Sequence, residues 1–160
     1  MSTLSQKDTV IFDDVVVFIK HYWEQALPSW GDVIDDLDYN VQHDKPVKFL
    51  DRFGFVTHFG ERIKEVSNVV DHIHNLRPKE VKPSAHLYIS MLTTSGTFGR
   101  HNDTSDVFYI QGLGSSRFDV EEGTGQTYVL EPGDLLYIPA SIYHTPQPLS
   151  PRVGISIGFD

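Results

Sequence analysis

The feature that most constrains the fold is a series of short apolar runs that fills the chain from residue 86 to its end. The runs are rich in β-branched and aromatic residues, and Gly, Pro, Ser or Asp separates each from the next. In order they read HLYISML, DVFYIQG, SRFDV, TYVL, DLLYIP and RVGISIGF. Several short strands divided by turn residues are typical of a β-sandwich or β-barrel, so we expect a mainly β fold.

The clearest helix lies upstream, in the stretch GERIKEVSNVVDHIHNLRP at residues 60–78. Its apolar residues recur at spacings of three and four, which places them on one helical face. They are Ile63, Val66, Val70 and Ile73. Proline does not continue a helix, so we predict that this helix ends before Pro78.

The remainder of the amino-terminal half has a mixed pattern. Residues 15–25, VVVFIKHYWEQ, fit a short amphipathic helix, although their three valines leave a strand possible. Residues 46–59, PVKFLDRFGFVTHF, alternate imperfectly and look extended. Because no linker interrupts the chain, we expect one domain over residues 1–160, with mixed α/β elements over 1–84 and the β core over 85–160.

Composition excludes several classes of function. The formal net charge is -9, so the chain offers no basic patch for nonspecific binding to nucleic acid or to anionic membranes. It contains no cysteine, which excludes disulfides, cysteine-ligated zinc and thiol catalysis. The amino terminus lacks a basic region followed by an apolar core, and no apolar run is long enough to span a membrane. We therefore expect a cytoplasmic protein.

A histidine and a carboxylate stand directly before the run DVFYIQG. His101 and Asp103 are two residues apart, so in an extended segment their side chains point to the same side. On the inner face of a sheet, such groups cost free energy unless something pairs with them. They therefore either face solvent or hold a ligand. In a chain without cysteine, a metal ion needs ligands of this kind.

A further histidine closes the stretch PGDLLYIPASIYH, residues 132–144. This stretch resembles the second motif of the cupin superfamily, G-x5-P-x-G-x2-H, with Ser141 in place of the second glycine and His144 as the histidine. The combined pattern is H-x-D-x2-D-V-F-x-I-Q-G-x-G, then L-x-PGD-x-LYIP-x4-H, then S-x-GF. It resembles the JmjC-type cupin-like hydroxylases, and within them most closely the ribosomal-oxygenase branch.

The resemblance implies a double-stranded β-helix, the jelly roll of the cupins, with amino-terminal helices. It also implies that His101, Asp103 and His144 bind Fe(II) and are the catalytic residues of a dioxygenase. Two imidazoles and one carboxylate on one face of an octahedral ion leave three positions open. In this family 2-oxoglutarate takes two of them and O2 takes the third. The implied activity is hydroxylation of a protein or small-molecule substrate that the sequence does not identify.

The cosubstrate anchor departs from the family pattern. The family places a Lys or Arg fifteen residues after the first histidine, where this chain has Ser116 followed by Arg117. A shift of one residue on a strand turns the side chain to the other face, so Arg117 substitutes only if a bulge intervenes. On the last strand, Arg152 and Ser156 alternate onto one face and are the preferred candidates, since a guanidinium can bind both oxygens of a carboxylate. Tyr88 is a further candidate for contact with 2-oxoglutarate.

Two alternatives remain open at this point. One is a metal-binding cupin without oxygenase activity, either a small-molecule binding module or an isomerase-like enzyme, which Ser116 favours. The other is a pseudo-enzyme used for protein contacts. The H-x-D…H arrangement favours the oxygenase, since cupins without redox chemistry more often carry additional His and Glu ligands. We expect a monomer or a weak homodimer.

Overall fold

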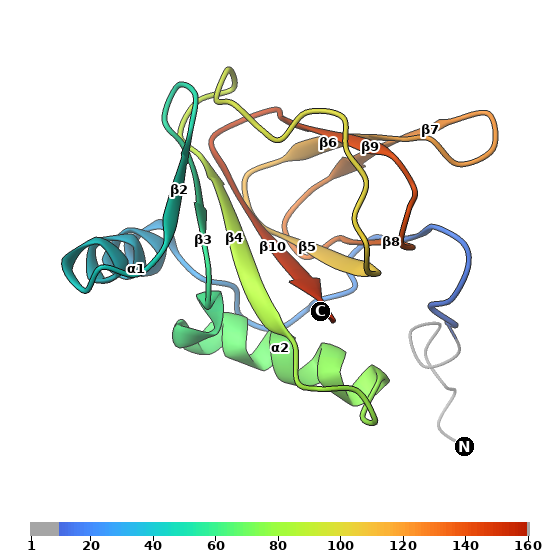
Figure 1. Cartoon of the computed structure of the whole chain (residues 1–160), viewed down its shortest axis with the longest axis horizontal. Coiled ribbons are helices and arrows are strands. Elements are labelled where there is room, and N and C mark those ends of the chain that lie inside the picture. Colours follow the sequence, from blue (N-terminus) through green and yellow to red (C-terminus); the bar gives the residue numbers. More distant parts are fainter. Residues whose placement is uncertain (1–9, 160) are drawn as a thin grey trace.

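The structure is a computed structural model that describes residues 10–159, and in it two antiparallel sheets face each other (Figure 1). The strand order of the large sheet is β1-β8-β5-β10-β4-β3-β2, and that of the small sheet is β7-β6-β9. The large sheet consists of β1 (Val17–Ile19), β8 (Leu135–Ile138), β5 (Val107–Leu113), β10 (Arg152–Gly158), β4 (Ser84–Ser90), β3 (Gly54–Thr57) and β2 (Val47–Leu50). The small sheet consists of β7 (Gln126–Leu130), β6 (Ser116–Val120) and β9 (His144–Pro148).

From β5 onward the chain passes back and forth between the two sheets. β5, β8 and β10 belong to the large sheet, whereas β6, β7 and β9 belong to the small one. Apolar side chains from both sheets fill the space between them, among them Tyr109, Phe118, Leu130 and Leu136. This alternation makes a double-stranded β-helix, so the predicted mainly β jelly roll is confirmed.

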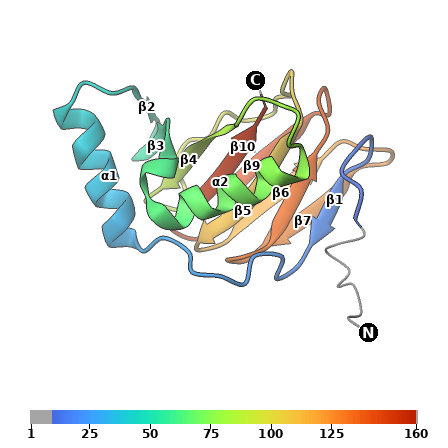
Figure 2. The same ribbon diagram turned by 90° about the horizontal axis from the view of Figure 1, so that it is seen from below.

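The helix predicted over residues 60–78 is also confirmed. It forms as a 3₁₀ turn, η2 (Gly60–Arg62), followed by α2 (Lys64–Leu76), which lies across the large sheet (Figure 2). The predicted apolar face is buried and packs on the outer side of the sheet. Along β4 the residues that meet it are Ala85, Leu87 and Ile89. The alternate residues of β4 therefore point to the inner side of the sheet.

The prediction of a helix over residues 15–25 is wrong. The segment contains a strand, which is the alternative that its three valines left open. Val17–Ile19 form β1, which pairs antiparallel with β8 at the edge of the large sheet. Only three residues of β1 pair with β8, so the strand is short. Residues 46–59 are extended as predicted and form the hairpin of β2 and β3.

A second helix, α1 (Trp30–Gln42), was not predicted from the sequence. Ser29 caps it, because its side chain accepts a hydrogen bond from the backbone N–H of Asp32 while the Asp32 carboxylate accepts one from the backbone N–H of Ser29. This reciprocal pair is a capping box, which starts a helix in a sequence of modest apolar periodicity. No helix in residues 10–159 combines the length and the apolar character that a membrane span requires. The sequence predicts no basic region followed by an apolar core at the amino terminus. Residues 1–9, which belong to that region, lie outside the described residues.

Candidate metal and cosubstrate site

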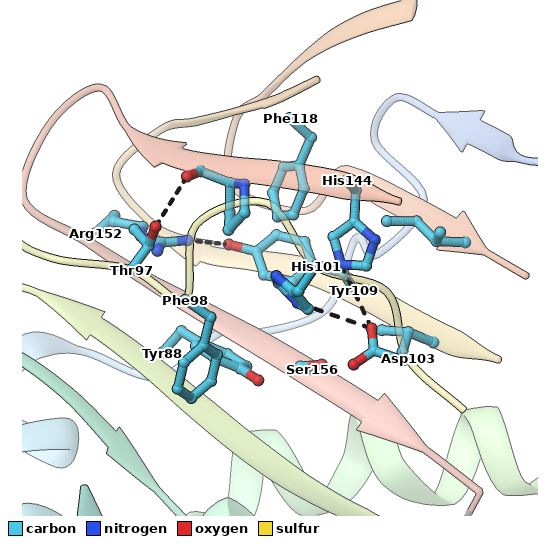
Figure 3. A pocket seen from close by; sticks show the side chains of 13 residues that line it. Tyr88, Thr97, Phe98, His101, Asp103, Tyr109, Phe118, His144, Arg152 and Ser156 are labelled. Atoms are coloured by element: carbon cyan, nitrogen blue, oxygen red, sulfur yellow. Dashed lines mark hydrogen bonds and ion pairs between the residues drawn. The ribbon is translucent and has the colours of Figure 1, made fainter. Parts of the chain in front are cut away.

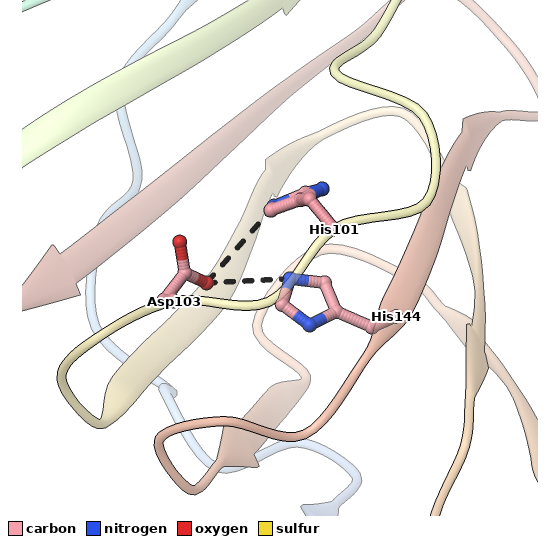
Figure 4. A group of neighbouring side chains, drawn as sticks. All are labelled: His101, Asp103 and His144. Atoms are coloured by element: carbon pink, nitrogen blue, oxygen red, sulfur yellow. Dashed lines mark ion pairs between the residues drawn. The ribbon is translucent and has the colours of Figure 1, made fainter.

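Backbone pairing brings the two histidines of the predicted triad together. His101 lies on the segment that leads into β5, and His144 is the first residue of β9. The N–H of His101 donates to the carbonyl of His144 at 3.0 Å, and the N–H of His144 donates to the carbonyl of His101 at 2.8 Å. Their ring centroids are 4.3 Å apart. This isolated β-bridge holds the two imidazole rings on the same side of the paired segments, where they face Asp103 (Figure 4).

The tautomers of both histidines follow from their hydrogen bonds. The Nδ1 atom of His101 lies 2.8 Å from the carbonyl oxygen of Gly99, and the Nδ1 atom of His144 lies 3.0 Å from that of Ile142. A carbonyl only accepts, so each Nδ1 carries the proton. In the neutral rings, each Nε2 then presents a lone pair.

Both lone pairs point toward the same carboxylate. The Oδ2 atom of Asp103 is 4.0 Å from Nε2 of His101 and 3.4 Å from Nε2 of His144. One ligand atom from each of the three residues lies within 4.8 Å of the other two. Two lone pairs directed at an anion repel it unless a cation lies between them. The three groups thus have the donor types, the orientation and the spacing that a divalent metal ion requires.

Burial favours the metal-binding form of His144. Burial is the largest cause that lowers the pKa of His144 below its ordinary value, and the neighbouring His101 acts in the same direction. The hydrogen bond to Ile142 and the charge of Asp103 oppose this shift. A lowered pKa keeps the imidazole neutral near pH 7, and only the neutral ring binds a metal.

The triad opens into a pocket between the two sheets, with Arg152 at its other end and Tyr109 between them (Figure 3). The lining residues from the large sheet include Tyr88 and Ser156. The predicted alternation of Arg152 and Ser156 onto the inner face of the last strand is therefore confirmed. Burial raises the pKa of Tyr88 to about 12, so that its phenol stays protonated near neutral pH.

Arg152 is buried among neutral partners. Its side chain is 2% exposed, and its Nε donates to the hydroxyl of Ser90 at 3.0 Å. Its Nη1 donates to Tyr109 Oη at 3.1 Å and to Ser116 Oγ at 3.3 Å. Among the described residues, no carboxylate lies within ion-pair distance of this guanidinium. A buried cation without an anion is costly, so the pocket is electrostatically prepared to accept a negatively charged group.

Arg117 lies outside this pocket, which corrects its place among the cosubstrate candidates. Its side chain is half-exposed on β6 and donates to the carboxylate of Asp119 at 3.1 Å. The register of β6 with β7 and β9 is regular, so no bulge turns Arg117 inward. Its neighbour Ser116 points inward instead and contacts Arg152. The guanidinium of Arg152 on β10 thus lies beside Ser116, the position on β6 where the family pattern has a basic residue.

Tyr109 is the main pocket residue that sequence reasoning missed. Its hydroxyl donates to Oε1 of Gln111 at 2.8 Å and accepts from Arg152, so it connects two strands of the large sheet. The ring passes over Gly154, where an added Cβ would clash with the Tyr109 hydroxyl oxygen. The alternation Arg-x-Gly-x-Ser on the last strand was the available signal, since a glycine between two inward polar residues leaves room for a large side chain.

Comparison with known proteins shows which folds and families the chain resembles. Residues 123–160 match the model of the JmjC domain family. No curated protein sequence matches the chain. A crystal structure of the Escherichia coli ribosomal oxygenase YcfD superposes with a TM-score of 0.75 at 21% identity, over 99% of this chain and 52% of that one. A YcfD structure in complex with cobalt and 2-oxoglutarate gives a TM-score of 0.71 at 20% identity, over 91% and 48%.

These likenesses establish the class of fold. The chain spans about half the length of the YcfD structures, and at these identities the similarity concerns the fold alone. The fold is that of the cupin-like double-stranded β-helix proteins. Within that class, residues 123–160 are similar to the JmjC domain family, so the resemblance predicted from the sequence is confirmed as a resemblance.

Proposed function

We propose that the protein is an Fe(II)- and 2-oxoglutarate-dependent hydroxylase. The observation that carries the proposal is a single pocket with His101, Asp103 and His144 at one end and the buried guanidinium of Arg152 at the other. A 2-oxo diacid matches this arrangement, because one end of it chelates a metal and the other end is a carboxylate. The YcfD complex with cobalt and 2-oxoglutarate supports the same cosubstrate for this fold.

Each residue has a defined part in this reaction. The two Nε2 atoms and the Asp103 carboxylate would hold the metal, and the carboxylate would offset part of its charge. Bound Fe(II) supplies the redox chemistry by which O2 oxidises 2-oxoglutarate and a substrate C–H bond together. The products are succinate, CO2 and the hydroxylated substrate, so that one oxygen atom enters succinate and the other enters the substrate.

The protein side chains orient the cosubstrate. Arg152 pairs with the distal carboxylate, and the hydroxyls of Ser90, Tyr109 and Ser116 hold the guanidinium in place. Ser156 and the protonated phenol of Tyr88 line the same pocket and can donate hydrogen bonds to an anion. The apolar residues Val107, Phe118 and Ile138 limit the access of water to the reacting atoms.

Arg152→Met tests the cosubstrate directly. With Mn(II) in the site and O2 excluded, calorimetry should show 2-oxoglutarate binding to the wild-type protein. Removing the charged anchor should cost about 2–5 kcal/mol, or roughly 30-fold to several thousand-fold in affinity. The matched control is Arg117→Met, which removes the same side chain from the outer face of β6 and should bind 2-oxoglutarate like wild type.

The same experiment separates the hydroxylase from the alternative of a metal-binding cupin without oxygenase activity. That alternative depended on Ser116 in place of a basic residue, and the guanidinium beside Ser116 supplies a cation at this position. If wild type binds Mn(II) but not 2-oxoglutarate, the alternative takes over. If Arg152→Met binds 2-oxoglutarate like wild type, the assignment of the anchor is wrong.

A further inference from the structure

A second hollow adjoins the pocket of the triad. The inner face of the large sheet continues over β4, β3 and β2, away from the small sheet (Figure 1). There it lines a cleft of about 370 Å³. The cleft shares five residues with the triad pocket, namely Tyr88, Phe98, Asp103, Val107 and Ser156. A molecule in this cleft therefore lies next to the proposed metal site, which makes the cleft the place for the prime substrate of the proposed hydroxylase.

The charges of the cleft differ from those of the whole chain. The chain carries 22 acidic and 13 basic residues. Among the described residues that line the cleft, however, Asp103 is the only carboxylate, and it belongs to the proposed metal triad. The ionisable or cationic side chains that remain are Lys48 from β2, His58 directly after β3 and His86 from β4. If a metal neutralises Asp103, the other described residues of the cleft present only neutral or positive groups.

Lys48 is placed close to the reaction centre by aromatic contacts. Its Nζ lies 4.6 Å from the centroid of the Phe98 ring. That ring packs edge-on against His101, with centroids 5.9 Å apart, and against Tyr88 at 5.7 Å. The ammonium group is thus separated from a proposed metal ligand by a single aromatic ring. Contact with the face of Phe98 also limits the positions that this exposed side chain adopts.

The two histidines form a hydrogen-bonded pair. Nδ1 of His58 lies 3.0 Å from Nε2 of His86, and the ring centroids are 4.4 Å apart. One of these nitrogens carries the proton and the other accepts. In neutral rings, the accepting ring then carries its proton on its other nitrogen, so the pair has a second N–H whichever ring donates. Neither ring of this pair carries a negative charge in either tautomeric arrangement.

We propose that this cleft selects a substrate with a carboxylate group near the carbon to be hydroxylated. The inference rests on the proposed hydroxylase function and names its substrate class. Lys48 and the His58–His86 pair would bind the carboxylate, while Phe98 and Val56 contact the adjoining carbon chain. A substrate with a cationic side chain would meet like charge at Lys48, which disfavours it. The carboxylate could belong to an acidic side chain of a protein or to a free small acid.

The test measures binding rather than turnover. The protein is loaded with Zn(II), which is diamagnetic, and saturated with 2-oxoglutarate so that Arg152 is occupied. Histidine and backbone resonances are then followed by NMR while matched probes are added. The probes are acetyl-Gly-Asp-Gly-amide, its Asn and Lys counterparts, and free aspartate. We expect the Asp peptide to bind about tenfold more tightly than the Asn peptide, as one charge-assisted contact allows, with shifts at His58 and His86.

Variants of individual cationic or ionisable residues identify the charge responsible. Lys48→Met should remove the preference for Asp over Asn. His86→Gln should reduce this preference and serves as the test if Lys48→Met does not fold. The matched control is Lys45→Met, an exposed lysine just before β2 that does not line the cleft. It should keep the full preference. Tighter binding of free aspartate than of the Asp peptide would identify a small acid as the source, and the reverse would identify a protein side chain.

Two results would overturn the inference: equal binding of the Asp and Asn peptides, or tighter binding of the Lys peptide. Failure of the proposed function looks different, because 2-oxoglutarate itself would then leave the resonances of Tyr109 and Ser116 unchanged before any probe is added. The carboxylate preference can fail while this cosubstrate response remains intact. The two hypotheses are therefore tested in one sample and separated by it.

Discussion

At the scale of single residues, Ser141 shows how the motif around His144 is built. It stands where the cupin pattern has its second glycine, and its φ of 71° lies in the left-handed region. Its backbone N–H donates to the carbonyl of Asp103 at 2.8 Å, so the turn links the loop of one triad residue to the strand of another. A serine in this conformation is strained by roughly 1–2 kcal/mol, because its Cβ approaches the following carbonyl.

Replacing Ser141 with glycine should stabilise the fold. The relief of left-handed strain exceeds the added flexibility of the unfolded chain, so the free energy of unfolding should rise by about 0.5–1 kcal/mol. Urea denaturation measures this change. Ser141→Ala is the matched control, because it keeps the Cβ and therefore the strain. Equal stability of the Gly and Ala variants would show that the conformation of this turn is not strained.

The residues of the triad were predictable from the sequence, whereas most partners of Arg152 were not. The spacing of His101 and Asp103 drew attention to them, and the resemblance to the cupin and JmjC motifs implied the triad with His144. The anchor for Arg152 is assembled from Ser90, Tyr109 and Ser116, which lie on three other strands. No local pattern encodes such a set, because it depends on strand order and register across both sheets.

At the scale of elements, β10 supplies a buried cation next to the position where the family pattern has one on β6. The guanidinium of Arg152 on β10 reaches the hydroxyl of Ser116 on β6 at 3.3 Å. The two side chains thus meet at one point of the pocket from opposite sheets. A cation introduced on β6 at this position should therefore occupy nearly the same place as the one that β10 supplies.

A double variant tests this exchange. Arg152→Ser should lose most of its affinity for 2-oxoglutarate, and Arg152→Ser combined with Ser116→Lys should regain at least about tenfold. Anaerobic calorimetry with Mn(II) gives both affinities. The single variant contains its own control, since Arg117 is still present and its outward side chain should not replace the anchor. If the double variant binds as weakly as the single one, the two positions are not equivalent.

Elements also differ in how far the sequence determines them. α2 was predictable because its apolar residues repeat with helical period and face the sheet. The segment 15–25 was not, since its valines suit either structure and only the free edge of β8 decides between them. α1 was missed because its one local signal is the capping box of Ser29 and Asp32, and its buried face has few apolar residues.

At the scale of the whole molecule, the large sheet serves two purposes along its inner face. Where the small sheet covers it, the space between the sheets forms the pocket with the triad and Arg152. Where β3 and β2 extend it beyond that cover, it forms the open cleft with Lys48 and the histidine pair. The outer face is closed by α2 and carries the main apolar core. Stability therefore resides mainly on one face of this sheet, and the proposed chemistry resides on the other.

The coupling between metal binding and stability of the whole fold should depend on pH. The pKa of His144 is lowered in the folded protein, so the unfolded chain binds a proton there more readily. Its contribution to stability is complete above about pH 6.5, the value of an unperturbed histidine, and is lost as the pH falls toward the folded pKa. Metal binding needs the same neutral ring, so metal affinity falls in the same direction.

Thermal unfolding with and without Mn(II), followed from pH 8 to pH 5, measures this coupling. At high pH, metal at 100 times its dissociation constant should stabilise the fold by about 2.7 kcal/mol, and this gain should disappear as the pH drops through about 6. The control is His144→Gln, which should show no gain from Mn(II) at any pH and a weaker decline of its metal-free stability between pH 7 and 5. A gain in wild type that stays constant down to pH 5 would mean that protons do not compete with the metal, and the two histidines would then not be its ligands.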